Sequence, residues 1–289
     1  YGAAIRQRHT AAPPVILHAH NVEHRIQERL ASDPLRSAPQ RWYRTILARQ
    51  TAAYETAISR MMDGVVALTD DDAVWFTHAR GASDGVAAIP PGVTLPSISQ
   101  RRASPLHIGF LGSLDWEPNV DGVLWFIHVI LPLIRKRHPG VVFEIAGRRV
   151  PERIRALHDG SHVIVVGEVE DAQATRASWI VNVVPLRSGS GIRIKILEAL
   201  AGADAVVTTS VGCEGIGLHN EAEVLIADDP QAFADACCKL LEAPDTARAM
   251  GERGRAFVAE RYAWSSAIAR FRAFVERTVL LTRREPAGD

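Results

Sequence analysis

The sequence is poor in cysteine, balanced in charge and without a long hydrophobic run. Its three cysteines, Cys213, Cys237 and Cys238, form neither a disulfide framework nor a Cys-x-x-Cys pair, which favours a reducing compartment. Lys plus Arg and Asp plus Glu both number 33, so the basic field that attracts nucleic acid is missing. No apolar run reaches the ~18 residues that span a bilayer, and no signal peptide is recognisable. These absences predict a cytoplasmic globular protein that binds no nucleic acid.

The length and the connecting segments indicate two domains. A chain of 289 residues with 47% apolar and 23% charged residues is typical of a globular protein of about two domains. It starts with Tyr1 rather than Met, so we expect a fragment or a processed form. The Pro/Gly connector "PPGVTLP" precedes a change in composition, which places a domain boundary near residue 100. We expect domains at 1–100 and 101–265, followed by a C-terminal helix at 266–289.

The N-terminal part contains short strands and a long helix. "PVILHAH" (14–20), "GVVAL" (64–68) and "VAAI" (86–89) are apolar, β-branched runs typical of strands. Apolar residues at helical spacing predict an amphipathic helix over 41–62. Thr69 and the three aspartates after it fit a helix start, because a capping hydroxyl and acidic residues stabilise that end; a metal site is the alternative.

From residue 106 onward, strands and helices alternate. The predicted strands are "LHIGFL", "VVFEIAG", "HVIVVG", "WIVNVVP", "DAVVTT" and "EVLIA". Continuous Val/Ile strands that alternate with helices are typical of a parallel sheet covered on both faces. Ligands of such sheets bind beyond the carboxyl ends of the strands. The predicted fold class is therefore α/β, with doubly wound, Rossmann-like parallel sheets.

The stretch "RSGSGIRIKILEA" carries the strongest chemical signal. It puts Arg193 and Lys195 at the beginning of a helix that is apolar over most of its circumference. The positive end of a helix dipole repels cations, and buried charge is costly unless it is paired or bound. The small residues before them let backbone N–H groups approach a ligand closely. The combination predicts an anion site for a diphosphate.

An ion pair within the helix is the alternative reading of these charges. Lys195 and Glu198 are i,i+3 neighbours and could pair, although this leaves Arg193 and the small residues unexplained. The loop is not a P-loop, because G-x-x-x-x-G-K-[ST] does not occur. "GFLG" and "GCEGIG" do not have the spacing of a Rossmann fingerprint either.

The segment "GSGIRIKILEALAG" resembles the donor-site signature of retaining glycosyltransferases of family four, which have the two-domain GT-B fold. The resemblance covers nearly the whole chain, and it implies that the helix at 266–289 crosses back to the first domain. Further segments resemble these enzymes in the same order: "LHAHNVEHR", "AIPPGV", "FLGSLDWEPNVDGVLWF", "VVGEVED", "TTSVGCEGI" and "GERGRAFVAERYAWSSAIARF".

The resemblance implies roles for individual residues. Arg193 and Lys195 would hold the donor diphosphate, and His20 would hydrogen-bond the transferred sugar. Glu198 would bind the nucleotide ribose, and residues 167–169 would lie near the nucleobase. No metal and no cofactor are expected, since the nucleotide sugar is the substrate. The donor-binding residues that the resemblance implies are Gly112, Gly167, Val169, Ser188, Gly189, Ser190, Gly191, Ile192, Glu198 and Glu214.

Three features need separate interpretation. The first Glu of the family's E-x7-E pattern falls at Ser190. Many relatives carry an Arg and a Lys in the loop after the second domain's first strand, whereas Ser113 and Asn119 supply no charge here. We therefore expect Arg193 and Lys195 to neutralise more of the diphosphate. His18, His20 and His24 could hold a metal, contact the sugar or have structural roles.

The predicted reaction is transfer of a hexose from a nucleotide-diphosphate sugar to a hydroxyl acceptor, with retention and without a metal. The acceptor would be a saccharide or a lipid-linked molecule in cell-surface polysaccharide or glycolipid synthesis. Arg41, Arg44 and Arg49 favour a solvated helix face, with peripheral contact with the inner face of the plasma membrane as the alternative.

Further hypotheses concern the N-terminal domain and the alternative functions. About three strands precede the boundary, where a doubly wound half has about five or six, so we expect a truncated domain and weak sugar transfer. A non-catalytic nucleotide-sugar binding fragment and a nucleotide-sugar epimerase of GT-B fold are the alternative functions.

Overall fold

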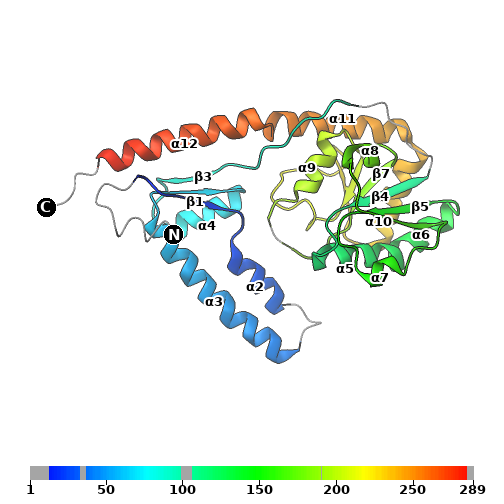
Figure 1. Cartoon of the computed structure of the whole chain (residues 1–289), viewed down its shortest axis with the longest axis horizontal. Coiled ribbons are helices and arrows are strands. Elements are labelled where there is room, and N and C mark those ends of the chain that lie inside the picture. Colours follow the sequence, from blue (N-terminus) through cyan, green and yellow to red (C-terminus); the bar gives the residue numbers. More distant parts are fainter. Residues whose placement is uncertain (1–12, 33–36, 99–105, 190, 285–289) are drawn as a thin grey trace. The chain divides into compact units, whose positions relative to one another are not determined.

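The computed structural model divides the chain into two compact units, whose elements are labelled in Figure 1. The described residues are 13–32, 37–98, 106–189 and 191–284. The first unit consists of the described residues within Tyr1–Gly92, Ser190–Ile192 and Trp264–Asp289, and the second of those within Val93–Gly189 and Arg193–Ala263.

The first unit is built on a parallel sheet in the order β1-β2-β3. Its central strand is an apolar run, and Val65, Val66 and Ala67 are fully buried in it. Burial on both sides is what a continuous run of such residues predicts. The bounds are β1 Ile16–Ala19, β2 Gly64–Ala67, β3 Val86–Ala88, α2 Glu23–Ser32, α3 Ala38–Met61, α4 Asp70–Arg80 and α12 Trp264–Arg284.

Helix α4 begins where the acidic triplet predicts it. The side-chain oxygen of Thr69 accepts a hydrogen bond from the backbone N–H of Asp72 at 3.0 Å, which satisfies one of the donors exposed at a helix start. Gly81 ends the helix in the left-handed conformation, with φ +73°. Asp72 also pairs with Arg25 at 3.3 Å. The helix-start interpretation is confirmed.

The sequence does not predict helix α2. For α3 it predicts the helix, but it wrongly predicts that the whole apolar stripe is buried. The stripe of apolar residues at helical spacing includes Trp42 and Tyr54, yet their residue exposures are 68% and 67%. Only part of that stripe is therefore buried. His24 holds α2 to α3, since its Nδ1 lies 2.8 Å from a carboxylate oxygen of Glu55. The Glu55 carboxylate also accepts from the backbone N–H of Glu23 at 2.7 Å.

Helix α12 packs on the sheet of the first unit. Phe274 is 3% exposed and forms an apolar cluster with Val66 and Ile89. A Cβ at Gly64 would lie 2.8 Å from the Phe274 ring, so glycine allows this close contact. The C-terminal helix and the N-terminal strands therefore belong to one unit.

The second unit contains a parallel sheet in the order β6-β5-β4-β7-β8-β9. In chain order this is 3-2-1-4-5-6, the doubly wound Rossmann arrangement, and it confirms the predicted fold class. The order reverses between β4 and β7, which pair directly. The bounds are β4 His107–Leu111, β5 Val142–Ala146, β6 Val163–Gly167, β7 Val181–Val184, β8 Val206–Thr208 and β9 Leu225–Ile226.

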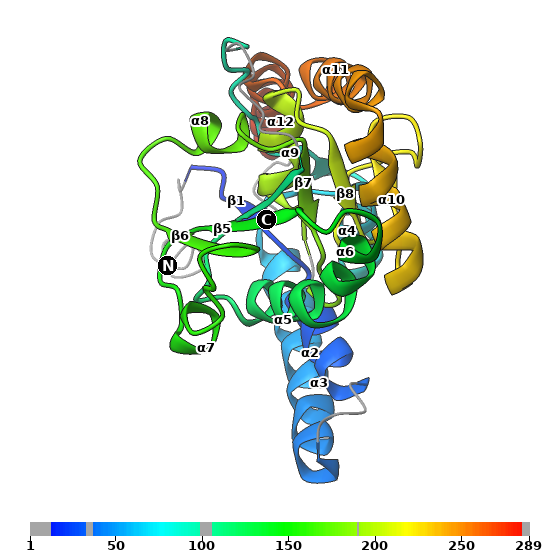
Figure 2. The same cartoon turned by 90° about the vertical axis from the view of Figure 1, so that its right-hand side faces the viewer.

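Helices cover both faces of this sheet, as Figures 1 and 2 show. Helices α5, α6 and α10 lie over one face, and α8 and α9 lie over the other, with α11 against α9. Buried Val, Ile, Leu and Phe side chains fill the layer between the sheet and the first group. The bounds are α5 Glu117–Trp125, η1 Phe126–Ile130, α6 Leu131–Arg137, α7 Glu152–Arg155, α8 Ala172–Arg176, α9 Ile194–Ala201, α10 Pro230–Glu242 and α11 Pro244–Arg261.

One continuous helical run, Glu117–Arg137, is long and apolar enough to cross a membrane by length and composition. Half of its most apolar window is buried inside the unit. Val123, Phe126 and Ile130 are fully buried and belong to the core of the sheet. Core packing therefore accounts for its apolar character.

Candidate functional site

Three glycines bring the carboxyl ends of β4, β5 and β6 close together. The backbone N–H of Gly112 donates to the carbonyl of Ala146 at 3.1 Å, and that of Gly147 donates to the carbonyl of Gly167 at 2.7 Å. A Cβ at Gly147 would lie 1.8 Å from the Gly112 carbonyl oxygen, so no side chain fits there. The predicted donor-binding residues Gly112 and Gly167 therefore lie at the strand ends where ligands of such sheets bind.

The loop after β7 is tied to the end of β8. The Thr208 hydroxyl donates to the carbonyl of Val184 at 3.0 Å, and the Thr209 hydroxyl donates to the carbonyl of Leu186. Gly122 of α5 allows the loop to pack closely against the helix, since a Cβ there would lie 2.5 Å from the carbonyl oxygen of Pro185. The loop after β7, which carries the predicted donor-binding residues Ser188 and Gly189, thus starts at a fixed place beside the reversal of strand order between β4 and β7.

Arg193 stands immediately before α9 and is 4% exposed. Its guanidinium carbon lies 5.7 Å from the centroid of the Trp116 ring. A Cβ at Gly189 would lie 2.8 Å from a guanidinium nitrogen of Arg193, so glycine lets the loop pass over the cation. Gly189 also has φ +130°, a conformation that favours glycine.

Lys195 lies in the first turn of α9 among neutral groups. Its ammonium donates to the side-chain oxygen of Asn119 and lies 4.8 Å from the centroid of the Phe110 ring. A Cβ at Gly112 would lie 2.8 Å from the Lys195 nitrogen. Burial, and then repulsion by Arg193, lower the pKa of Lys195 to about 7. This environment favours an added anion.

The alternative pairing within the helix is wrong. Both residues lie in the described part of the chain, and there no ion pair joins Lys195 to Glu198. The Glu198 side chain is exposed, and its backbone carbonyl accepts from Arg176 at 3.4 Å. Two neighbouring cations at a helix start, above the reversal of strand order, form a site suited to a diphosphate.

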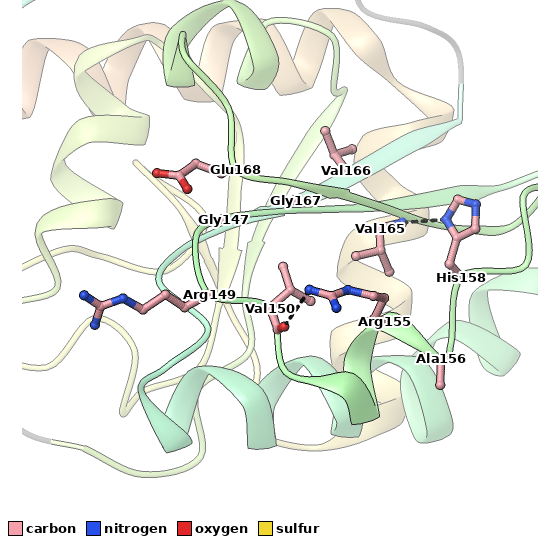
Figure 3. Close-up of a pocket in the computed structure, with 10 residues that line it drawn as sticks. All are labelled: Gly147, Arg149, Val150, Arg155, Ala156, His158, Val165, Val166, Gly167 and Glu168. Carbon is pink, nitrogen blue, oxygen red and sulfur yellow. Dashed lines mark hydrogen bonds between the residues drawn. The ribbon is translucent and has the colours of Figure 1, made fainter.

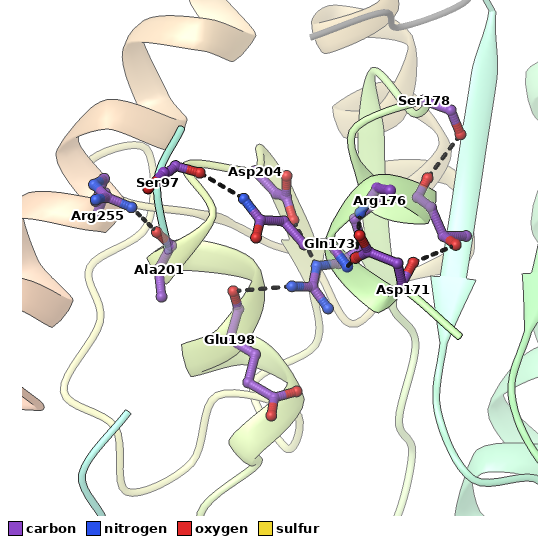
Figure 4. A network of polar contacts seen from close by, with 11 residues as sticks. Ser97, Asp171, Gln173, Arg176, Ser178, Glu198, Ala201, Asp204 and Arg255 are labelled. Carbon is purple, nitrogen blue, oxygen red and sulfur yellow. Dashed lines mark hydrogen bonds and ion pairs between the residues drawn. The ribbon is translucent and has the colours of Figure 1, made fainter. Parts of the chain in front are cut away.

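A buried ion pair holds the far end of α9, as Figure 4 shows. The Arg176 Nε lies 2.9 Å from a carboxylate oxygen of Asp204, and their side chains are 7% and 5% exposed. Arg176 also reaches the carbonyl of Glu198, and Arg255 donates to the carbonyl of Ala201. Sequence reasoning missed this network, because its members are distant in the sequence and belong to different elements.

Two arginines after β5 reach the loop after β4, where the sequence supplies no cation of its own at Ser113 or Asn119. The Nε of Arg148 donates to the Ser113 hydroxyl at 3.0 Å, and a guanidinium nitrogen of Arg149 lies 2.5 Å from a carboxylate oxygen of Asp115. Arg193 and Lys195 are therefore not the only cations at these strand ends. The dipeptide Arg148–Arg149 directly after a strand was the available signal.

Arg149 also lines a hollow of about 620 Å³ beside the ends of β5 and β6, shown in Figure 3. The predicted residue Gly167 is part of its wall, together with Gly147 and Glu168. Gly167 has φ +82° and open space where a Cβ would stand. The hollow adjoins the strand ends that carry the glycines. Its full lining is Gly147, Arg149, Val150, Arg155, Ala156, His158, Val165, Val166, Gly167 and Glu168.

The other predicted donor-binding residues have varied places. In the second unit, Ser188 is exposed, Val169 is half-buried after β6, and Glu214 is half-buried in the turn after β8. Gly191, with φ +77°, and Ile192 group with the first unit. Ser190 lies outside the described residues.

The predicted sugar-contacting His20 is exposed at the end of β1 in the first unit. Its ring centroid lies 4.9 Å from that of His18, edge to face. Burial, and then the nearby His20, lower the pKa of His18. His24 instead has a structural partner in Glu55. Among the described residues, no group of three His, Cys, Asp or Glu side chains is arranged to hold a metal.

Parts of the chain are similar in sequence to a known family and to a known protein. The family model described as glycosyl transferases group 1 matches residues 105–243. An uncharacterized 44.6 kDa protein in the cps region of Klebsiella pneumoniae is 28% identical over 136 residues, which are 44% of this chain and 35% of that protein.

Solved structures resemble the chain over a larger part of its length. A point mutant of S. aureus TarM, in complex with fondaparinux, alpha-GlcNAc-glycerol and UDP, matches with a TM-score of 0.66 and 16% identity, over 78% of this chain and 46% of that one. Sucrose-phosphate synthase from Thermosynechococcus elongatus matches with a TM-score of 0.68 and 20% identity, over 96% of this chain and 69% of that one. The chain has the GT-B fold that its sequence predicts, and it spans less than half of the Klebsiella protein and of TarM.

Proposed function

We propose that this chain is the donor-binding part of a retaining glycosyltransferase, which transfers a hexose from a nucleotide-diphosphate sugar to a hydroxyl acceptor. One observation carries the proposal: Arg193 and Lys195 stand together at the start of α9, beside the reversal of strand order between β4 and β7. The match of residues 105–243 to group 1 glycosyl transferases and the UDP held by TarM support it.

In this proposal the two cations stabilise the leaving group. Negative charge grows on the diphosphate as the glycosidic bond to the sugar breaks. Arg193, Lys195 and the N-terminus of α9 stabilise that charge without requiring a metal. One preorganised contact of this kind contributes about 3–4 kcal/mol to lowering the barrier. Glu198 would bind the ribose and His20 the transferred sugar.

The wider assignments are part of the same proposal. The second unit is the donor-binding domain, the first unit belongs to the acceptor side, and α12 packs with the latter. The acceptor is a saccharide or a lipid-linked molecule in cell-surface polysaccharide or glycolipid synthesis, which the cps region of the Klebsiella relative supports. The enzyme is cytoplasmic, and Arg41, Arg44 and Arg49 of α3 contact the membrane surface.

Transfer and its stereochemistry can be tested together. The full chain is incubated with UDP-glucose and a panel of saccharide and lipid-linked acceptors, and proton NMR follows the anomeric signals of donor and product. We expect a glycoside with the α configuration of the donor. A β-configured product would overturn retention, and release of free epimerised sugar without an acceptor would favour an epimerase. Donor binding without any product would favour a non-catalytic binding fragment.

A further inference from the structure

Asn119 is a buried side chain at the site for which the proposed reaction has no role. It lies in the first turn of α5 and is 3% exposed. Its amide nitrogen donates to the Ser113 carbonyl at 2.6 Å, and its oxygen accepts from the Lys195 ammonium. The Ser113 bond fixes which end of the amide faces Lys195. The oxygen is therefore held toward the cation.

The other groups around the Lys195 ammonium do not neutralise it. The ring of Phe110 lies below it at 4.8 Å, and that of Trp116 lies at 6.0 Å. Gly112 leaves the space that the ammonium fills, and the charge that acts on the ammonium is the cation Arg193, immediately before α9. Within the described residues, no carboxylate forms an ion pair with Lys195.

A neutral acceptor and a carboxylate would have opposite effects here. An amide oxygen orients the ammonium and leaves its full charge available to a ligand. A carboxylate in the same place would pair with the ammonium, keep it protonated and cancel its attraction for an anion. Asn119 thus combines the shape of Asp with no charge.

We propose that Asn119 is a positioning residue, whose neutral amide aims the Lys195 ammonium at the donor diphosphate without neutralising it. This inference rests on the proposed function, because it requires a bound diphosphate. It also explains how the loop after β4 contributes to the site although Ser113 and Asn119 carry no charge.

The test compares UDP-glucose binding by calorimetry in the wild type, Asn119→Asp and Asn119→Ser. Each phosphate of UDP-glucose carries one ester and one anhydride bond and has a single, strongly acidic oxygen, so their charge is constant from about pH 6 to about pH 8. The wild type should lose affinity as the pH rises through about 7, as Lys195 loses its proton. Asn119→Asp should bind at least about tenfold more weakly at pH 6 and lose this pH step, because the new carboxylate raises the pKa of Lys195.

Asn119→Ser shortens the side chain and withdraws its acceptor oxygen from Lys195 without adding charge, so the variant should also bind more weakly but keep the pH step. Asn220→Asp is the matched control: Asn220 accepts from the Ile226 backbone N–H in a turn of the same unit, and wild-type binding is expected. Wild-type affinity in both Asn119 variants, or an unchanged pH step in Asn119→Asp, would overturn the inference. If Asn119→Asp fails to fold, wild-type affinity in Asn119→Ser is enough to overturn it. Failure of the wild type to bind any nucleotide sugar would instead contradict the proposed function.

Discussion

Arg193 and Lys195 are neighbours in space, and their charges depend differently on pH. Arg193 lies against Trp116 and Gly189, and a guanidinium stays protonated at any pH in ordinary use. The Lys195 ammonium lies beside Phe110 and Asn119, and its pKa falls to about 7. Arg193 therefore supplies permanent charge, whereas Lys195 supplies charge that depends on pH.

Replacing Arg193 by Ala should reduce hexose transfer at least about 100-fold, because one contact to the developing charge is lost. The thermal unfolding of the variant should remain close to that of the wild type. Initial rates at saturating donor check the prediction. Arg248→Ala is the control, since Arg248 forms an exposed ion pair with Asp245 on α11 and should leave turnover unchanged. Near-normal turnover of Arg193→Ala would remove the diphosphate assignment.

The lowered pKa of Lys195 predicts pH-dependent binding of a nucleotide sugar. In the proposed function a diphosphate binds the ammonium form, which predominates below about pH 7 and is lost above it. At about pH 8 roughly a tenth of the free protein carries the ammonium, so affinity for UDP-glucose should be about tenfold lower than at about pH 6. Calorimetry at both pH values measures this ratio. Lys195→Met should bind weakly at both, and a ratio in Lys195→Met equal to that of the wild type would assign the effect to another group.

At the scale of elements, α9 depends on a support that is remote from the cations it carries. The buried pair of Arg176 and Asp204 joins α8 to the segment after α9, and Arg176 also reaches the carbonyl of Glu198. Removing one member of a buried pair leaves the other charge uncompensated. The pair is therefore important for stability as well as for the placement of the helix.

Asp204→Ala should lower the free energy of unfolding of the second unit by roughly 3–5 kcal/mol. Arg176→Met in the same chain should restore part of the loss, because no buried charge then remains. Urea unfolding curves of the single and double variants measure both values. Lys239→Ala, which removes an exposed pair with Glu221, should change the free energy by less than about 1 kcal/mol. An equal effect of Asp204→Ala and Lys239→Ala would show that the buried pair is not a support.

The elements of the second unit could be predicted from sequence because its strands are continuous apolar runs. Helix α2 could not be predicted in the same way, since a contact with Glu55, about thirty residues further along, holds its first turn. The position of Arg193 and Lys195 at the beginning of a helix could be predicted because the sequence of that helix is apolar. The partners Trp116 and Asn119 could not, because only the pairing of β4 with β7 brings their loop to α9.

At the scale of the molecule, the strand order of the second unit is what makes the site. The reversal between β4 and β7 leaves their carboxyl ends side by side, with Gly112 after one and the loop of Ser188 and Gly189 after the other. Strand alternation predicts the doubly wound sheet, but it gives no information on which strand ends meet. The same strand order places β5 beside β4, which lets Arg148 and Arg149 after β5 reach the loop after β4.

The most direct test of the diphosphate site is titration of UDP into the full chain and into the double variant Arg193→Ala/Lys195→Met, at about pH 6.5 and low salt. We predict one site in the wild type and a loss of at least about 100-fold in affinity in the double variant, with both proteins equally folded by circular dichroism. Equal affinity in the two proteins, or no binding by the wild type, would contradict the account.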